Sequence, residues 1–273
     1  MVKNENMKHD ELIQELCRVY GFLKFDSNNS ELKKDYEKLK EIALKRMNSY
    51  SLIEGMSLQE LLTHEEVVTN RTQIDEVFNK LNKYLDNKVS RPKNLSNHDQ
   101  AVFIIMMDNS GSMGRYEKCV AKAMTTWSKL LLEDRYDKIK TEFIVHHTEA
   151  KSVNEDTFFN VTEAGGTIAS TSYIRCLEII NSSNFGKNDI YVMHISDGDN
   201  LPSDNLRTVN YLHDILNKVN QVHYVEVNQY NRSSTLMHGF KSLNNPKFIK
   251  STIKDEKDIL KAILDTFELL ACF

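Results

Sequence analysis

The hydrophobic positions divide the chain into two parts with different periodicity. In residues 1–90 the apolar residues recur at spacings of three and four, which is typical of amphipathic helices. One of these helices follows Ser30, which we predict to be its N-cap. The polar stretch around Pro92 that follows is typical of a linker. The sequence therefore predicts a helical N-terminal region with its linker over residues 1–97.

Residues 98–273 alternate continuous apolar runs with amphipathic segments. Continuous apolar runs are expected of strands that are buried on both faces of a sheet. We predict strands at Ala101–Met107, Ile139–Val145, Asp189–Ile195 and Val222–Val227. We predict helices at Tyr116–Leu132, Thr171–Ile180, Asp204–Val219 and Asp255–Leu270. Strands that alternate with helices indicate an α/β fold with a doubly wound, mainly parallel sheet.

Composition and charge disfavour nucleic-acid-binding, membrane and secreted proteins. The chain has 35 basic and 39 acidic residues, so a nucleic-acid partner is disfavoured, because such proteins usually carry a basic surplus. No apolar run approaches the roughly 18 residues of a membrane span, so no membrane association is expected. The polar N-terminus does not resemble a secretory signal, and the four cysteines stand singly, as is typical of reduced thiols. We therefore expect a cytoplasmic protein.

Polar side chains follow the first and third predicted strands. Asp108 comes directly after the first strand, and Ser110 and Ser112 follow it at intervals of two residues. Asp197 comes after the third strand, and a Gly-Gly pair precedes Thr167 just before a predicted helix. Because ligands of open α/β sheets bind at the carboxyl ends of the strands, we expect these five side chains to converge there.

Two carboxylates and three hydroxyls form a set of oxygen ligands. Such a set, with no thiolate or imidazole in these loops, suits a hard divalent cation. We expect Mg²⁺ first, with Mn²⁺ or Ca²⁺ as alternatives, and we do not expect zinc. Adjacent His146 and His147 point to opposite faces of a strand and are not expected to chelate one ion. We expect His194 and His223, inside apolar strands, to be hydrogen-bonded core residues.

These motifs resemble a known arrangement. Asp108-x-Ser110-x-Ser112, then Thr167 after a Gly-Gly pair, then Asp197-Gly, is similar to the metal-ion-dependent adhesion site (MIDAS) of von Willebrand factor A (VWA) domains. Longer peptides extend the resemblance to the YhbH/YeaH-type family, stress- and sporulation-associated bacterial proteins with such a domain. These peptides are DNSGSMG, FIVHHTEAKSV, AGGTIASTSY, HISDGDN and STLM.

The resemblance implies a VWA-like domain over residues 98–273 that binds a divalent cation through the five residues named above. It also implies a non-enzymatic protein–protein interaction module, in which an Asp or Glu carboxylate of the partner docks on the cation. The partners that the family implies are a PrkA-type serine protein kinase with an AAA+ module and SpoVR-like proteins, in a sporulation or stress-response assembly.

An enzymatic function is the alternative. A haloacid dehalogenase-like, Mg²⁺-dependent phosphotransferase or phosphatase also begins with an aspartate at the end of its first strand, which would make Asp108 the nucleophile. That chemistry needs a carboxylate two residues later as general acid and base, and Ser110 occupies this position. The chain also contains no Walker A motif. We therefore predict that the protein is not an enzyme.

Overall fold

The computed structural model describes one domain at length and a short part of the N-terminal region. The described residues are 29–31, 33–35, 37–38, 100–161, 165–182, 185, 188–255, 258–263 and 265. The chain divides into two compact units, Met1–Met56 and Ser57–Phe273, and most described residues belong to the second. The boundary predicted between residues 97 and 98 lies outside the described residues and stays a prediction.

The described residues between 30 and 38 are helical, as the sequence predicts for this segment. The N-cap is Asn29 and not Ser30, which is already in the helix. The Oδ1 atom of Asn29 accepts a hydrogen bond from the amide of Glu31 at 3.1 Å, and its carbonyl accepts one from Lys33 at 3.1 Å. Asparagine caps a helix as well as serine does, so the sequence alone offers two equivalent choices. The other helices predicted in residues 1–90 lie outside the described residues.

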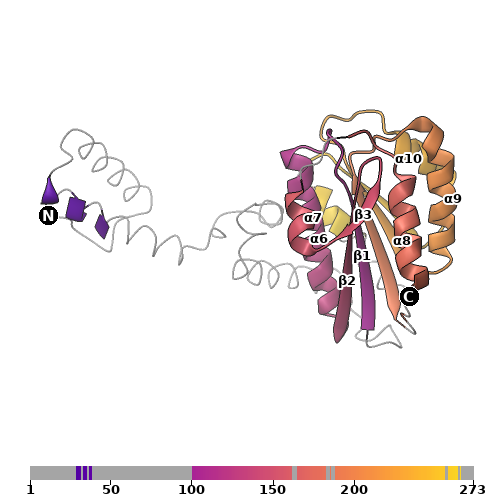
Figure 1. Cartoon of the computed structure of the whole chain (residues 1–273), viewed down its shortest axis with the longest axis horizontal. Helices are drawn as coiled ribbons and strands as arrows, with labels where there is room; N and C mark the ends of the chain where they lie inside the picture. The colour runs from indigo at the N-terminus through magenta and orange to yellow at the C-terminus, as the bar shows by residue number, and fades with distance from the viewer. Residues whose placement is uncertain are drawn as a thin grey trace. The chain divides into compact units, whose positions relative to one another are not determined.

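A six-stranded sheet forms the centre of the described domain (Figure 1). Its strands are β1 (Gln100–Asp108), β2 (Lys138–His146), β3 (Ala150–Val153), β4 (Asp189–Ser196), β5 (Gln221–Val227) and β6 (Phe248–Ile253). Their order in the sheet is β3-β2-β1-β4-β5-β6, and every neighbouring pair is parallel except β2 with β3. The mainly parallel α/β sheet is thus confirmed, while β3 and β6 were not predicted.

Helices cover both faces of the sheet, which makes the fold doubly wound (Figure 1). One face carries α6 (Arg115–Glu133) and α7 (Glu155–Asn160). The other carries α8 (Ser170–Ser182), α9 (Asn205–Leu216) and the short α10 (Thr235–Gly239). Two 3₁₀ turns, Pro202–Asp204 and Phe240–Ser242, precede α9 and follow α10, and residues 258–263 are helical where the closing helix is predicted. None of the described helices is long and apolar enough to cross a membrane.

The central strand β1 shows why its sequence is continuously apolar. Val102, Ile104 and Met106 pack into a buried cluster with residues of α8 and α9. Phe103 points to the other face, where it lines a small internal pocket with Leu131 of α6. Alternate residues of β1 therefore fill two separate cores, and polar side chains occur only at its two ends, Gln100 and Asp108.

Histidines in the strands take part in the core, as predicted for His194 and His223. The Nε2 atoms of His146 and His194 lie 2.8 Å apart, and Nδ1 of His194 lies 2.9 Å from the hydroxyl of Tyr173. His223 Nε2 lies 2.8 Å from the hydroxyl of Ser251. Burial lowers the pKa values of His146 and His223 to about 3, so both rings are neutral at physiological pH.

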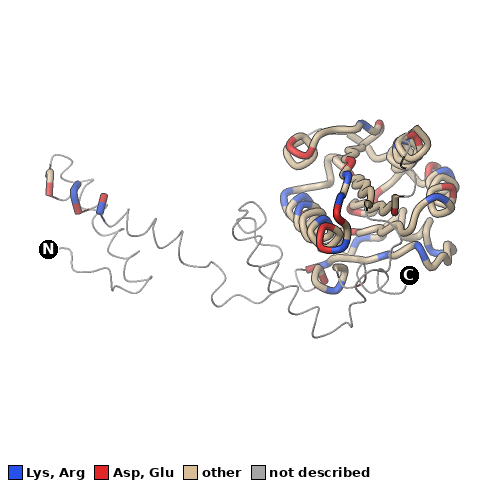
Figure 2. Tube along the Cα trace, turned by 90° about the horizontal axis from the view of Figure 1, so that it is seen from below, with Lys and Arg blue, Asp and Glu red and all other residues tan. Residues whose placement is uncertain are grey.

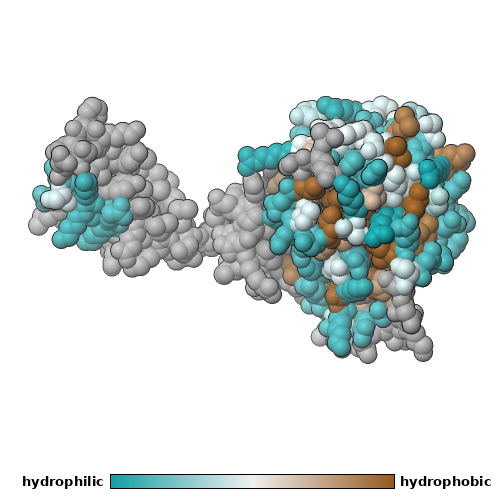
Figure 3. Space-filling model, in the orientation of Figure 1, coloured by the Kyte–Doolittle hydropathy of each residue, from teal (hydrophilic) through white to brown (hydrophobic). Residues whose placement is uncertain are grey.

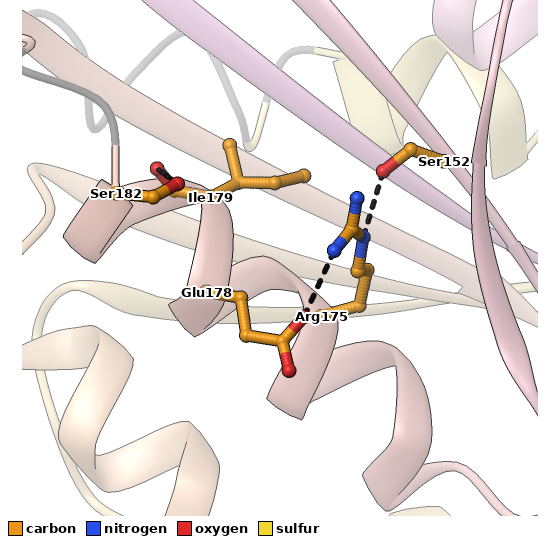
Figure 4. A network of polar contacts seen from close by, with 5 residues as sticks. All are labelled: Ser152, Arg175, Glu178, Ile179 and Ser182. Atoms are coloured by element: carbon orange, nitrogen blue, oxygen red, sulfur yellow. Dashed lines mark hydrogen bonds and ion pairs between the residues drawn. The ribbon is translucent and has the colours of Figure 1, made fainter.

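The antiparallel edge strand β3 is tied to α8 by polar contacts (Figure 4). Arg175 Nε donates to the hydroxyl of Ser152 at 2.9 Å, and Arg175 Nη1 pairs with Glu178 at 2.9 Å. At the end of the same helix, the hydroxyl of Ser182 donates to the carbonyl of Ile179. The contact between Arg175 and Ser152 is solvent-exposed and contributes little energy, so it orients the edge strand more than it stabilises the domain.

Candidate metal centre

The candidate centre lies where β1 and β4 end. Successive strands of the chain are added on one side of β1 up to β3 and on the other side from β4 onward. The carboxyl ends of β1 and β4 therefore flank the topological switch point of the sheet, where open α/β folds bind their ligands. Asp108 is the last residue of β1, and Asp197 follows the last residue of β4.

Asp108 is fully buried and held by two hydrogen bonds. Its Oδ1 accepts from the amide of Ser110 at 2.8 Å, which closes a local turn at the strand end. Its Oδ2 accepts from the hydroxyl of Ser196 in β4 at 3.0 Å. These contacts fix the orientation of the carboxylate relative to both strands.

The two serine hydroxyls of the first loop lie next to each other. Ser110 Oγ is 3.1 Å from Ser112 Oγ, and the carbonyl of Ser110 accepts a hydrogen bond from Met113 within the same turn. Asp108 and Ser110 are buried, whereas Ser112 is exposed. The three side chains therefore run from the protein interior to the surface along one short loop.

Asp197 contributes a second carboxylate close to the first. It is partly exposed, and its Oδ1 accepts from the amide of Asp199 at 3.1 Å. Burial, and to a lesser degree the charge of Asp197, raises the pKa of Asp108 to about 7, although hydrogen bonds from Ser110 and Ser196 oppose the rise. A buried carboxylate beside a second carboxylate favours a cation, which would stabilise the ionised form of Asp108.

The loop that contains Thr167 lies between the other two loops. The carbonyl of Gly165 accepts from the amide of Gly111 at 3.3 Å, and the carbonyl of Thr167 accepts from Leu201 at 3.2 Å. Thr167 itself is half-buried. The structure thus joins the three loops through their backbones, but within its described residues the Thr167 hydroxyl has no hydrogen bond to the other four side chains.

Three residues beyond the predicted set hold the Asp197 loop in place. Gly198 has a φ of 88°, and its carbonyl accepts from the amides of Thr235 and Leu236 at 3.1 Å each. The hydroxyl of Ser234, the N-cap of α10, donates to the Gly198 carbonyl at 3.3 Å and also to the buried carboxylate of Glu226. The STLM peptide therefore has a structural role, since it clamps the loop that carries Asp197.

A further buried carboxylate, that of Asp204, joins α8 to α9. It accepts from the amide of Ser170 at 2.9 Å, from the Ser170 hydroxyl at 2.6 Å and from the Thr208 hydroxyl at 3.0 Å. Asn200 adds a second link, because its Oδ1 accepts from the amide of Ala169 at 2.9 Å. Asn200 lies in the HISDGDN peptide, but no sequence pattern indicates its partner or the role of Asp204.

The residues present fit a hard cation that relies on hydroxyl ligands. The described residues include no cluster of three or more His, Cys, Asp or Glu side chains suited to a metal ion. A cation at the ends of β1 and β4 would therefore need Ser110, Ser112 and Thr167 beside the carboxylates of Asp108 and Asp197. Neutral hydroxyl and few carboxylate ligands suit Mg²⁺, which keeps several of its waters in protein sites.

Curated bacterial proteins are similar to a large part of this chain. A UPF0229 protein of Halalkalibacterium halodurans is 43% identical over 183 residues, which are 67% of this chain and 46% of that protein. A UPF0229 protein of Shouchella clausii is 44% identical over 170 residues, which are 62% of this chain and 44% of that protein. The chain thus spans less than half the length of these relatives.

Two solved structures are similar to part of the chain. The crystal structure of the SpRpn10 VWA domain has a TM-score of 0.47 and 9% identity, and covers 60% of this chain and 93% of its own. The crystal structure of the manganese-loaded Plasmodium vivax TRAP protein has a TM-score of 0.44 and 13% identity, and covers 63% of this chain and 74% of its own.

A protein-family model matches most of the chain. The model described as "Protein of unknown function (DUF444)" matches residues 28–269. The match includes both the described α/β domain and most of the region that precedes it. The chain therefore belongs to the DUF444 family.

Proposed function

We propose that the protein is a metal-dependent protein–protein interaction module. The observation that carries the proposal is the buried carboxylate of Asp108, held between Ser110 and Ser196, with the carboxylate of Asp197 close by. A buried carboxylate next to another charge of the same sign is costly in an empty site. A divalent cation at this point offsets that cost and gives the two carboxylates a common role.

The ligand set leaves the cation able to bind a further anion. Asp108 and Asp197 are the two carboxylates of the set, and Ser110, Ser112 and Thr167 are neutral. Mg²⁺ in such a site keeps bound water, and Mn²⁺ or Ca²⁺ can take its place. A partner's Asp or Glu carboxylate replaces one of these waters, so that the cation becomes part of the interface.

The proposed partners are proteins. Figure 2 shows basic and acidic residues interspersed along the described domain, in keeping with the net charge of −4, so the protein offers no excess of basic charge to a nucleic acid. From the resemblance to the YhbH/YeaH-type family we propose a PrkA-type serine protein kinase and SpoVR-like proteins as partners. By the same resemblance the setting is a cytoplasmic assembly for sporulation or stress response.

A phosphotransferase with Asp108 as nucleophile is less well supported. The hydroxyl of Ser110 occupies the position of the required acid and base, and it contacts the hydroxyl of Ser112 and the carboxylate of Asp108. A serine hydroxyl does not exchange protons at neutral pH as a carboxylate does. We therefore propose that Asp108 binds a cation and does not attack a substrate.

The proposal is tested by recovery of the proposed partners on immobilised protein. The full chain and its Asp108→Ala variant are each incubated with the purified PrkA-type kinase and SpoVR-like protein, in Mg²⁺ or in EDTA. We expect recovery only with the unaltered chain in Mg²⁺. The control is Asp214→Ala, which removes an exposed carboxylate of α9 and should behave as the unaltered chain does. Equal recovery by the unaltered chain and Asp108→Ala, in Mg²⁺ and in EDTA alike, contradicts the proposal.

A further inference from the structure

An open groove of about 480 Å³ begins at the candidate metal centre. Ser112 and Asp197 form its end at the centre, and its walls are the start of α6 and the loop that follows β5. The other lining residues are Gly114, Arg115, Tyr116, Glu117, Asp199, Val227, Asn228, Gln229, Tyr230, Arg232 and Ser233. A molecule bound in this groove would therefore reach the cation proposed at the centre.

The loop that follows β5 is ordered by its own hydrogen bonds. Asn228 Oδ1 accepts from the amide of Arg232 at 2.7 Å, and Asn228 Nδ2 donates to the Arg232 carbonyl at 2.9 Å. Asn231 takes a left-handed conformation with a φ of 51°, a conformation that asparagine tolerates. The Arg232 guanidinium lies over the ring of Tyr230, 5.0 Å from its centroid. The loop thus presents a fixed pair of an arginine and a tyrosine beside the groove.

The charge of the groove depends on the cation. Its basic side chains are Arg115 and Arg232, and its acidic ones are Glu117, Asp197 and Asp199. Glu117 is buried and accepts a hydrogen bond from Gln229 at 2.7 Å. Without a cation these three carboxylates outnumber the two guanidinium groups. A bound divalent cation, counted together with its ligand Asp108, brings the groove and the centre to a net charge of zero. An acidic ligand is therefore less strongly repelled by the metal-loaded protein, in which the cation and Arg232 are the groups that can bind its carboxylates.

Exposed apolar side chains point to a protein ligand. Among the described residues the exposed large hydrophobic side chains are Leu201, Leu206 and Tyr230. Leu201 and Leu206 follow β4, and Tyr230 follows β5, so all three lie beyond the carboxyl ends of strands. Figure 3 shows hydrophobic surface at this upper edge of the domain, above α9 and α10. Of the three, Tyr230 lines the groove, and tyrosine and arginine are enriched in protein contacts.

We infer that the groove binds an extended acidic segment of the partner protein that carries two carboxylates. One carboxylate binds the cation, and the second pairs with the guanidinium of Arg232, while the chain between them packs on the ring of Tyr230. The inference rests on the proposed function and adds the chemistry of the partner. Arginine binds a carboxylate through two parallel hydrogen bonds. Because the Arg232 side chain already lies over the Tyr230 ring, it loses less conformational freedom when a carboxylate binds.

The probe that tests this is a phage-displayed library of short random peptides. The library is selected on the immobilised full chain in Mg²⁺ and eluted at high salt. We expect enriched peptides to share two acidic positions at a fixed spacing. Their affinities are then measured by fluorescence anisotropy for the unaltered chain and for Arg232→Glu, for which we expect binding weaker by about tenfold.

A matched control separates the effect of the groove from a general effect of charge. Arg207 is also exposed and also lies over a tyrosine, 5.8 Å from the ring centroid of Tyr211, but it does not line the groove. We expect Arg207→Glu to leave the affinity unchanged. Peptides whose second acidic residue is replaced by lysine should bind Arg232→Glu better than they bind the unaltered chain.

The outcomes distinguish this inference from the proposed function. Selection of no peptide, selection of peptides with a single acidic position, or equal affinity for Arg232→Glu and the unaltered chain would overturn the inference. Peptides that need Arg232 but bind equally in EDTA and to Asp108→Ala would overturn the proposed metal dependence and leave the groove as an acidic-peptide site. Peptides that need Asp108 and Mg²⁺ but not Arg232 would overturn the inference and leave the proposed function standing.

Discussion

The side chain of Asp108 is fully buried, and the charge of a second carboxylate acts on it. Burial and the negative charge of Asp197 both disfavour its ionised form. Because burial raises the pKa of Asp108 to about 7, the cation-free site holds a mixture of the neutral and ionised forms at neutral pH. Cation binding favours the ionised form, so metal affinity should increase with pH in this range.

A substitution at Gly198 tests whether the conformation of the loop that carries Asp197 requires glycine at this position. Its φ of 88° disfavours any side chain, and an added Cβ would lie 2.5 Å from both Glu226 Oε2 and Ser234 Oγ. We expect Gly198→Ala to lower the free energy of unfolding by about 1–3 kcal/mol in a urea titration. Gly166→Ala is the matched control, because a Cβ there meets no atom within 4 Å. A stability loss of the same size in both variants would contradict the account of the clamp.

The buried side chain of His223 should make the free energy of unfolding depend on pH. Burial lowers its pKa from 6.5 to about 3, so between these values the unfolded chain binds a proton that the native chain does not. The free energy of unfolding should therefore fall as the pH decreases from about 6.5 towards about 3. We expect His223→Gln to show a shallower decrease in urea titrations over this range, although other buried histidines keep some of it. An unchanged slope would show that His223 is not the source.

The parts of the site that the sequence could predict are local in the chain. The spacing of Asp108, Ser110 and Ser112 is visible because one turn brings them together, and the structure joins them by hydrogen bonds. The contacts of Ser196 with Asp108, and of Ser234 with Glu226, join residues of different strands or loops. No spacing rule indicates such pairs, since they depend on the order of the strands in the sheet.

At the scale of elements, the four predicted strands and the helices predicted at Tyr116–Leu132, Thr171–Ile180 and Asp204–Val219 are found with ends shifted by a few residues. Their signal is strong because continuous apolar runs and helical periodicity follow directly from burial. The strand β3 was not predicted, because its four residues include Lys151 and Ser152 and lie at an exposed edge. The strand β6 contains the exposed Lys250, and α10 is only five residues long. Short or half-exposed elements bury too little apolar surface to leave a periodic pattern.

The connection between α8 and α9 yields a prediction at this scale. Asp204 is buried and accepts three hydrogen bonds from Ser170 and Thr208, so its removal leaves buried donors without an acceptor. We expect Asp204→Ala to lower the free energy of unfolding by about 3 kcal/mol, as measured by urea titration. Asp214→Ala on the exposed side of α9 is the control and should change it by less than about 0.5 kcal/mol. Equal effects of the two substitutions would contradict a structural role for Asp204.

At the scale of the whole molecule, the sheet packs the cores with its strands and carries the proposed cation site at their carboxyl ends. The side chains of the strands fill the two cores, whereas the residues that we assign to the cation lie at the last position of β1 and in loops. Substitutions at the candidate site should therefore change ligand binding with little effect on folding.

Mg²⁺ should stabilise the native protein if it binds the site. A ligand that binds only the native state adds about 2.7 kcal/mol to the free energy of unfolding at a hundred times its dissociation constant. We expect the midpoint of thermal unfolding to rise with Mg²⁺ concentration and to return to its starting value in EDTA. For Asp108→Asn we expect a midpoint that does not respond to Mg²⁺. A response that persists in this variant would mean that the stabilising cation binds elsewhere.

The most direct test of the central claim is the measurement of Mg²⁺ binding by isothermal titration calorimetry. The full chain should bind Mg²⁺ at one site, and Asp108→Asn should weaken that binding by at least the roughly hundredfold that changes around a metal site can cause. Asp214→Asn, which removes an exposed carboxylate, should leave the binding unchanged. Equal affinities of the unaltered chain and Asp108→Asn would contradict the assignment of this site to a divalent cation.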